Sequence, residues 1–174
     1  MSSDTQQQVS GLRICRLQPE DYQAKAQVHA QTWQETYEGV LPDWLVDKIT
    51  PEFALEVTKR HGRDATLVAK IGDQLVGFAE YIDPARAPIA SPNTAELGAI
   101  YVLQAWQGQG IGRGLFQAVA RAVSTPRLAL WVQEANRKAQ SFYRAMGMHP
   151  TGQVLVEDDG SNRSLEYVNF DSRG

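Results

Sequence analysis

The sequence predicts a mixed α/β fold of the α+β kind, with a mostly antiparallel, twisted, seven-stranded sheet flanked by helices. Two observations carry this prediction. Apolar segments pair around short turns, so that hairpins are expected over residues 65–82 and 154–170. A strand, a glycine-rich loop and an amphipathic helix follow one another over residues 95–123. The expected order is a strand, two or three helices, three strands, a helix, a strand, a helix and two strands.

Composition indicates one ordinary globular domain. The chain has 174 residues, 43% hydrophobic and 21% charged. We expect a disordered tail over residues 1–10 and a single domain over 11–174. The lone Cys15 excludes an internal disulfide and favours a reducing compartment. No apolar run suggests a membrane span or a signal peptide, and a net charge of −3 offers no footprint for nucleic acid. A cytoplasmic protein is expected, with neither membrane nor nucleic acid as a partner.

The pattern of residues 12–62 predicts one strand followed by helices. Residues 12–17 alternate as a strand does, and Pro19 then opens a helix that ends at Gly39. Residues 42–49 predict a short helix. Thr50 and the proline after it form a helix start, and that helix closes at Gly62.

Two hairpins and a loop account for most of the remaining chain. Residues 65–71 and 75–82 are expected as strands around the turn 72–74. The proline-rich segment 84–93 predicts a loop that borders a cleft. Strands at 154–156 and 164–170 are expected to close the fold.

The glycine-rich loop predicts a phosphate site. Glycines alternate at the positions Gly108, Gly110, Gly112 and Gly114. Such a loop can turn its backbone N–H groups inward, and the helix after it adds unpaired N–H groups and its positive dipole end. A pyrophosphate is the ligand most suited to this arrangement.

The residues around these glycines separate three kinds of phosphate loop. A Walker loop is excluded because Arg113, and not lysine, follows Gly112. A dinucleotide loop does not fit its third glycine, although Glu134 stands at the distance of its acidic residue, so an NAD-binding oxidoreductase is a remoter alternative. The pattern Gln/Arg-x-x-Gly-x-Gly/Ala fits every position of 107–112.

Residues 107–112 thereby resemble the GCN5-related N-acetyltransferases (the GNAT family). Residues 136–148 resemble that family's second signature, Asn-x-x-Ala-x-x-Phe-Tyr-x-x-x-Gly-Phe, with Met148 in place of the last Phe. The resemblance is strong over residues 95–148. It implies the family fold, acetyl-coenzyme A as cosubstrate, and acetyl transfer to a primary amine of a small molecule or of a protein or peptide. Direct transfer is expected because no residue stands out as a nucleophile for a covalent acetyl intermediate. Relatives often form homodimers, which is a further expectation. A non-catalytic module that senses acetyl-coenzyme A is the alternative.

The resemblance also implies residues for the chemistry. Tyr143 matches the tyrosine that protonates the departing thiolate. Strict strand alternation puts Glu96 on the same side as Gly98, Ile100 and Val102, where its carboxylate could act as the general base or hold a relaying water, with Glu80 as a second candidate.

Coenzyme contacts are expected along the central strand, the loop and the second signature. Asn136 fits a pantetheine contact and a helix N-cap, and Lys138 is either a 3′-phosphate partner or a solvated charge. Gln107 stands where many relatives have arginine, so one charge-assisted contact is missing. The residues expected to bind the coenzyme are Ile100, Tyr101, Val102, Gln107, Gly108, Gln109, Gly110, Ile111, Gly112, Arg113, Asn136 and Tyr143.

Little in the sequence indicates the acceptor. Trp33 and Tyr37 lie where relatives cover the substrate cleft, and their spacing weakly resembles the polyamine acetyltransferase branch. A helix stripe packed on the sheet explains the same spacing. Together with Glu80, these residues are the expected acceptor contacts. The three histidines are scattered, so no metal site is predicted.

Overall fold

The computed structural model describes residues 9–62, 65–157 and 159–171. Residues 1–8 of the expected tail lie outside this description, and Val9 packs against the core. The strands are β1 (Leu12–Arg16), β2 (Thr66–Ile71), β3 (Gln74–Ile82), β4 (Ala95–Val102), β5 (Leu128–Gln133), β6 (His149–Glu157) and β7 (Asn162–Val168). The α-helices are α1 (Tyr22–Tyr37), α2 (Asp43–Val46), α3 (Pro51–His61), α4 (Ile111–Ala122) and α5 (Arg137–Ala145). Short 3₁₀ turns, η1 (Pro19–Asp21) and η3 (Gln104–Trp106), precede α1 and follow β4.

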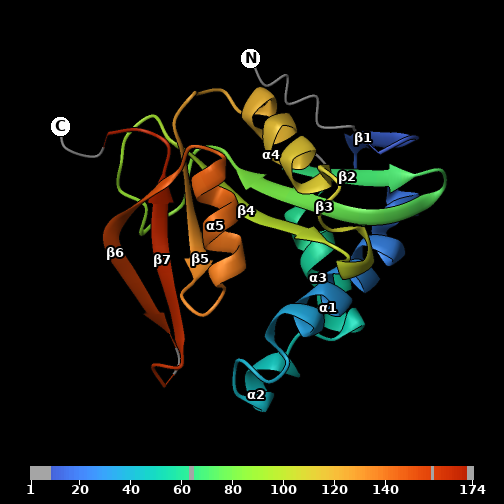
Figure 1. Ribbon diagram of the computed structural model, residues 1–174, viewed down its shortest axis with the longest axis horizontal. Helices are drawn as coiled ribbons and strands as arrows, with labels where there is room; N and C mark the ends of the chain where they lie inside the picture. The colour runs from blue at the N-terminus through green and yellow to red at the C-terminus, as the bar shows by residue number, and fades with distance from the viewer. Residues whose placement is uncertain (1–8, 63–64, 158, 172–174) are drawn as a thin grey trace.

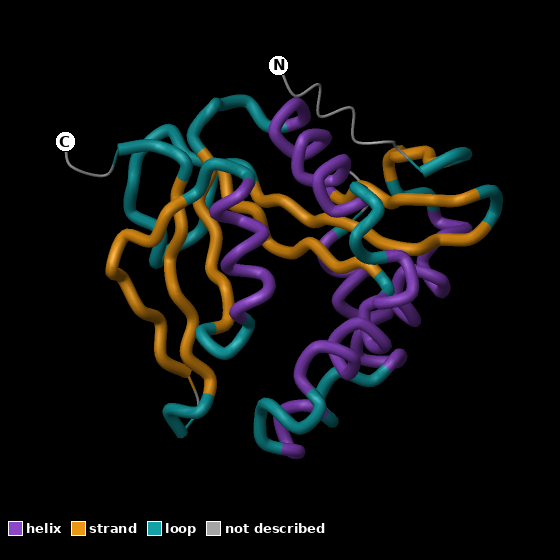
Figure 2. Tube along the Cα trace, viewed as in Figure 1, coloured by secondary structure: helices purple, strands orange, loops and turns teal. Residues whose placement is uncertain are grey.

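The strands form one seven-stranded sheet in the order β1-β2-β3-β4-β5-β7-β6. Every neighbouring pair is antiparallel except β4 and β5. The predicted fold class and strand number are confirmed. Figure 1 shows that the strands β5 to β7 turn away from β2, β3 and β4, and Figure 2 shows helices on both sides of the larger half of the sheet.

Helices cover the two faces of the sheet with separate apolar clusters. Side chains of α4 and α5, such as Leu115 and Tyr143, pack on one face with the β4 residue Leu97. Side chains of α1, such as Val28, pack on the other face with Phe78 of β3. Ala26 and Ala30 of α1 are buried, whereas Trp33 and Tyr37 pack with Leu45 and Val46 of α2, in a cluster separate from those on the sheet.

The junction between β4 and β5 is where the sheet opens. The two strands pair only from Ala95 to Leu97 on β4, against Leu128 to Leu130 on β5. The β3 residues Glu80 and Tyr81 are consecutive, yet they face Ala99 and Leu97, so Gly98 is the extra residue of a β-bulge. Beyond this bulge, one edge of β4 has no strand beside it among the residues that the structure describes. An open strand edge of this kind can accept main-chain hydrogen bonds from an extended ligand.

The starts of α4 and β6 are among the boundaries that differ from those expected. The helix after the glycine loop begins at Ile111, so Gly112 and Gly114 lie inside α4. A Cβ atom on Gly114 would approach the Ile14 Cδ1 atom to 2.9 Å, so this glycine permits close packing and not a turn. Strand β6 begins at His149 and not at residue 154, with an irregularity between Pro150 and Val154 that hides its alternation. No helix within the described residues has the length and apolar character needed to cross a membrane.

Candidate active site

A cavity of about 920 Å³ lies where β4 and β5 diverge. It is walled by the open end of β4, the loop after it, and the first turns of α4 and α5, with α1 closing one side. All the residues expected to bind the coenzyme line this one cavity. Of the other site residues expected from sequence, Trp33, Tyr37, Glu80 and Glu96 are not among its lining residues.

The open edge of β4 exposes main-chain groups to the cavity. The Leu103 N–H donates a hydrogen bond to the Val76 carbonyl of β3 at 2.9 Å. Successive strand residues direct their N–H and C=O groups to opposite sides, so Ile100 and Val102 direct theirs away from β3. The Gln107 side-chain amide accordingly donates to the Val102 carbonyl at 3.0 Å. An extended ligand with amide groups could take similar bonds here.

The loop ends in an N-terminus of α4 that has no side-chain cap. Gly110 is the N-cap residue and adopts φ +83°, a left-handed conformation that favours glycine, and Gly108 has φ +77°. The first helical hydrogen bond runs from the Gly114 N–H to the Gly110 carbonyl at 3.0 Å. The N–H groups of the turn before it are therefore left for a ligand, at the positive end of the helix dipole.

Asn136 caps α5 and also reaches α1. Its side-chain oxygen accepts a hydrogen bond from the Ala139 N–H at 3.0 Å, which is the N-cap contact. Its side-chain nitrogen donates to the Tyr37 hydroxyl at 3.3 Å. Tyr37 is thus brought to the site through Asn136, although it does not line the cavity itself.

Three phenols interact electrostatically around the cavity. Burial raises the pKa of Tyr143, and the Tyr37 hydroxyl raises it further. Burial likewise raises the pKa of Tyr101, with contributions from Tyr37, Tyr143 and Glu80. Within the described part of the chain, no hydrogen bond joins the Tyr101 or Tyr143 hydroxyl to another residue. Both phenols therefore stay protonated at neutral pH and have a proton to donate.

Glu96 pairs with Arg86 and does not line the cavity. The Arg86 Nη2 atom lies 2.7 Å from the carboxylate, and the Arg86 backbone N–H donates to it at 3.2 Å. Strict alternation is wrong at this point, because the bulge at Gly98 reverses it. Leu97, Ile100 and Val102 pack on the α4 face, so Glu96 projects from the opposite face.

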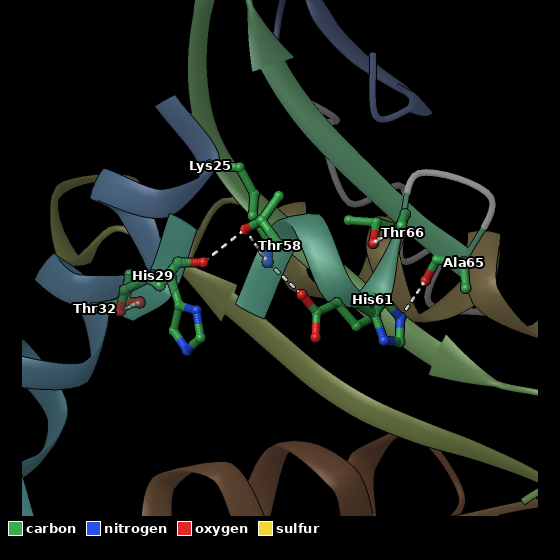
Figure 3. A network of polar contacts seen from close by, with 10 residues as sticks. Lys25, His29, Thr32, Thr58, His61, Ala65 and Thr66 are labelled. Atoms are coloured by element: carbon green, nitrogen blue, oxygen red, sulfur yellow. Dashed lines mark hydrogen bonds and ion pairs between the residues drawn. The ribbon is translucent and has the colours of Figure 1, made fainter. Parts of the chain in front are cut away.

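Glu80 belongs to a buried polar cluster on the α1 face. Lys25, which is 0% exposed, forms an ion pair with Glu80 and donates a hydrogen bond to the Thr58 hydroxyl at 2.9 Å. Figure 3 shows Lys25 and His29 projecting from α1 and Thr58 from α3. This cluster joins α1, α3 and β3. No periodic pattern in the sequence indicates this cluster, since a lysine on a helix is ordinarily exposed.

His29 connects the cluster to the cavity wall. Its ring stacks on Tyr101 with the centroids 5.4 Å apart. Burial, reinforced by the charge of Lys25 and opposed by Glu80, lowers the pKa of His29 to about 4. The imidazole is therefore neutral at physiological pH, and it packs against the Tyr101 ring as an uncharged ring.

The α1 wall of the cavity contains residues that the sequence analysis did not single out. Thr32, Glu35 and Thr36 line it, whereas Trp33 turns away and donates from its indole N–H to the Val46 carbonyl at 3.1 Å. The spacing of Thr32 and Thr36 by one helical turn, with Glu35 between them, is a polar stripe that could have indicated this wall.

Comparisons with known proteins show the family of this chain. Residues 26–148 match the acetyltransferase (GNAT) family. The chain is 26% identical to the probable N-acetyltransferase Rv2775 of Mycobacterium tuberculosis, over 92% of this chain and 93% of that protein. It is 30% identical to the uncharacterized N-acetyltransferase YuaI of Bacillus subtilis, over 72% and 73%.

A solved structure extends this similarity to a coenzyme complex. The PaiA N-acetyltransferase of Thermoplasma acidophilum, crystallised with coenzyme A, aligns with a TM-score of 0.62 and 25% identity, over 89% of this chain and 97% of that one. The mixed, mostly antiparallel sheet also removes the structural basis for a dinucleotide-binding oxidoreductase. The chain belongs to the acetyltransferase (GNAT) family.

Proposed function

We propose that this protein transfers the acetyl group of acetyl-coenzyme A directly to a primary amine, with both substrates bound together. The observation that carries this proposal is the cavity between the open edge of β4 and two helix N-termini, which Tyr143 also lines. A homodimer and a cytoplasmic location stay predictions.

The coenzyme would lie along β4 as an extra strand. Its pantetheine amides would bond the main-chain groups that Ile100 and Val102 direct into the cavity. Its pyrophosphate would take the N–H groups of residues 108–113, where Arg113 adds positive charge. The cavity is also large enough for a ligand of this class, since small-molecule sites span about 300–1,000 Å³.

Tyr143 is the general acid in this proposal. The amine attacks the thioester carbon, the carbon–sulfur bond breaks, and the coenzyme leaves as a thiolate that Tyr143 protonates. The phenol is protonated at neutral pH, its raised pKa makes it a weaker acid than a free phenol, and solvent can return its proton. No side chain of the cavity is needed as a covalent carrier of the acetyl group.

Water in the cavity would accept the proton that the amine loses. Both carboxylates considered from the sequence are engaged by cations, Glu96 by Arg86 and Glu80 by Lys25. Among the described residues, Glu35 supplies the carboxylate that lines the cavity, at its α1 wall. Its oxygen accepts the Gln104 N–H at 3.2 Å. We therefore propose that Glu35, Thr32 and Thr36 contact the acceptor amine. Trp33 and Tyr37 do not line the cavity and support the α1 wall from behind.

Thiol release on a panel of amines tests this proposal. The purified protein and acetyl-coenzyme A would be incubated with spermidine, tyramine, free lysine and a lysine-containing peptide, and products identified by mass spectrometry. The proposal expects one acetylated amine with an equal amount of free coenzyme A thiol. Tight binding of acetyl-coenzyme A without acetylation of any amine would favour the sensing module instead.

A further inference from the structure

Lys138 places a positive charge at the start of the coenzyme loop. Its Nζ atom donates a hydrogen bond to the Gln107 side-chain oxygen at 2.5 Å, across 31 positions of the chain. The Gln107 side-chain nitrogen is used as well, because it donates to the Val102 carbonyl at 3.0 Å. Both polar atoms of Gln107 are thus engaged, whereas the ammonium group of Lys138 has two further N–H bonds to offer.

This lysine has no carboxylate within ion-pair distance among the residues that the structure describes. It is exposed and lines the cavity. A cation held at a cavity rim by a neutral amide, and not neutralised by a carboxylate, can bind an anion without first breaking an ion pair.

The position of Lys138 is unfavourable for its own helix. Asn136 is the N-cap of α5, so Arg137 and Lys138 occupy the first turn, where the structure has no acidic residue. The helix dipole favours negative and disfavours positive charge at this end. Local rules of this kind are most often broken at functional sites, and an anion bound beside the turn would reverse the repulsion.

We propose that Lys138 binds the pyrophosphate of coenzyme A and supplies, from α5, the cation that the loop lacks at Gln107. The hydrogen bond to the Gln107 side-chain oxygen positions the ammonium group of Lys138 for this contact. The inference rests on the coenzyme occupying this cavity. It selects the pyrophosphate over the 3′-phosphate because the ammonium group lies at Gln107, which begins the loop that leads into the α4 N-terminus.

Calorimetric titration with coenzyme A and with 3′-dephospho-coenzyme A tests this assignment. Lys138→Gln should raise the Kd about tenfold for both ligands, as expected for one lost charge-assisted contact. Arg144→Gln, at the other end of the same helix, should leave both Kd values unchanged. Lys138→Arg should bind as the unmodified protein does, which separates the charge from folding.

A second variant moves the charge to the loop. Gln107→Arg in the Lys138→Gln background should recover most of the lost affinity, whereas Gln107→Arg alone should gain little because two cations then meet. A loss confined to coenzyme A would assign Lys138 to the 3′-phosphate and overturn the proposal. If Lys138→Gln and the unmodified protein bind coenzyme A with equal affinity, the Lys138 ammonium group is only a solvated charge and the proposal is wrong. Failure of the unmodified protein to bind either ligand would overturn the coenzyme site itself.

Discussion

The side-chain amide of Asn136 donates a hydrogen bond to the Tyr37 hydroxyl at 3.3 Å and so joins residues 99 positions apart. The same side chain caps α5 through Ala139. One residue therefore fixes the start of α5 and ties it to the end of α1, across the opening between β4 and β5. This contact joins α1, which forms one wall of the cavity, to the helix that carries Tyr143.

Two substitutions at Asn136 separate its roles. Asn136→Ala removes the cap and should lower the free energy of unfolding by about 1 kcal/mol. Asn136→Asp keeps an acceptor for the Ala139 N–H and should retain that stability, yet it loses the donor to Tyr37 and adds negative charge beside the phosphate site. We expect weaker coenzyme binding from Asn136→Asp than from Asn136→Ala. Urea unfolding and calorimetry measure the two effects, and the reverse ranking in affinity would contradict a ligand role.

Tyr143→Phe should reduce turnover while leaving coenzyme affinity intact. The phenol proton is lost but the ring still fills its place in the core, so kcat should fall about a hundredfold, within the range of general acid catalysis. Tyr22→Phe, on the α1 face away from the cavity, is the control and should have no effect on kcat. Unchanged turnover in Tyr143→Phe would remove this residue from the mechanism.

Glu96→Gln should affect stability more than chemistry. Glu96 is 2% exposed and accepts charge-assisted bonds from Arg86, so losing its charge should cost about 1–3 kcal/mol of unfolding free energy. Its kcat should stay within a few-fold of the original, because the carboxylate does not line the cavity. A fall of about a hundredfold or more in kcat, without a change in coenzyme affinity, would restore Glu96 as the base.

Lys25→Met should be one of the most destabilising single changes in the protein. It leaves the Glu80 carboxylate buried without its cation, which costs about 3–5 kcal/mol in comparable sites. The double variant Lys25→Met, Glu80→Leu should recover much of that loss, since an apolar pair of similar volume can replace a buried ion pair. Denaturant titration of the three proteins gives the comparison. A double variant that is less stable than Lys25→Met would contradict this account.

His29 should make the fold weaker in mild acid. Its folded pKa of about 4 lies below the ordinary value of 6.5, mainly because of burial and then because of Lys25. Between these two values the unfolded chain binds more protons, so the free energy of unfolding falls as pH drops from 6.5 toward 4, by roughly 3 kcal/mol in all. His29→Phe keeps a ring against Phe78 and Tyr101 and should flatten this part of the profile. Equal slopes in both proteins would show that other groups carry the pH dependence.

Sequence patterns predicted the elements of the fold and a set of residues that line one cavity, because both depend on local sequence. The loop 107–112 and the cap at Asn136 are contiguous signatures with their own geometry. The bulge at Gly98 could not be foreseen, since it is set by pairing with β3, and it reverses the face on which Glu96 lies. The burial of Lys25 depends on Glu80 and Thr58, which are distant in the chain. The glycine pattern predicts a loop position for Gly114, whereas it lies inside α4 against Ile14 of β1, a neighbour that is distant in the chain.

Calorimetric titration with acetyl-coenzyme A, with NAD as a parallel ligand, tests the central claim most directly. The cavity between β4 and α5 predicts binding of acetyl-coenzyme A at one site per chain and no binding of NAD. A Gly110→Ala variant should weaken it, because alanine strains the left-handed residue that presents the α4 N-terminus. Binding of NAD alone, or acetyl-coenzyme A binding that Gly110→Ala leaves unchanged, would contradict this account of the site.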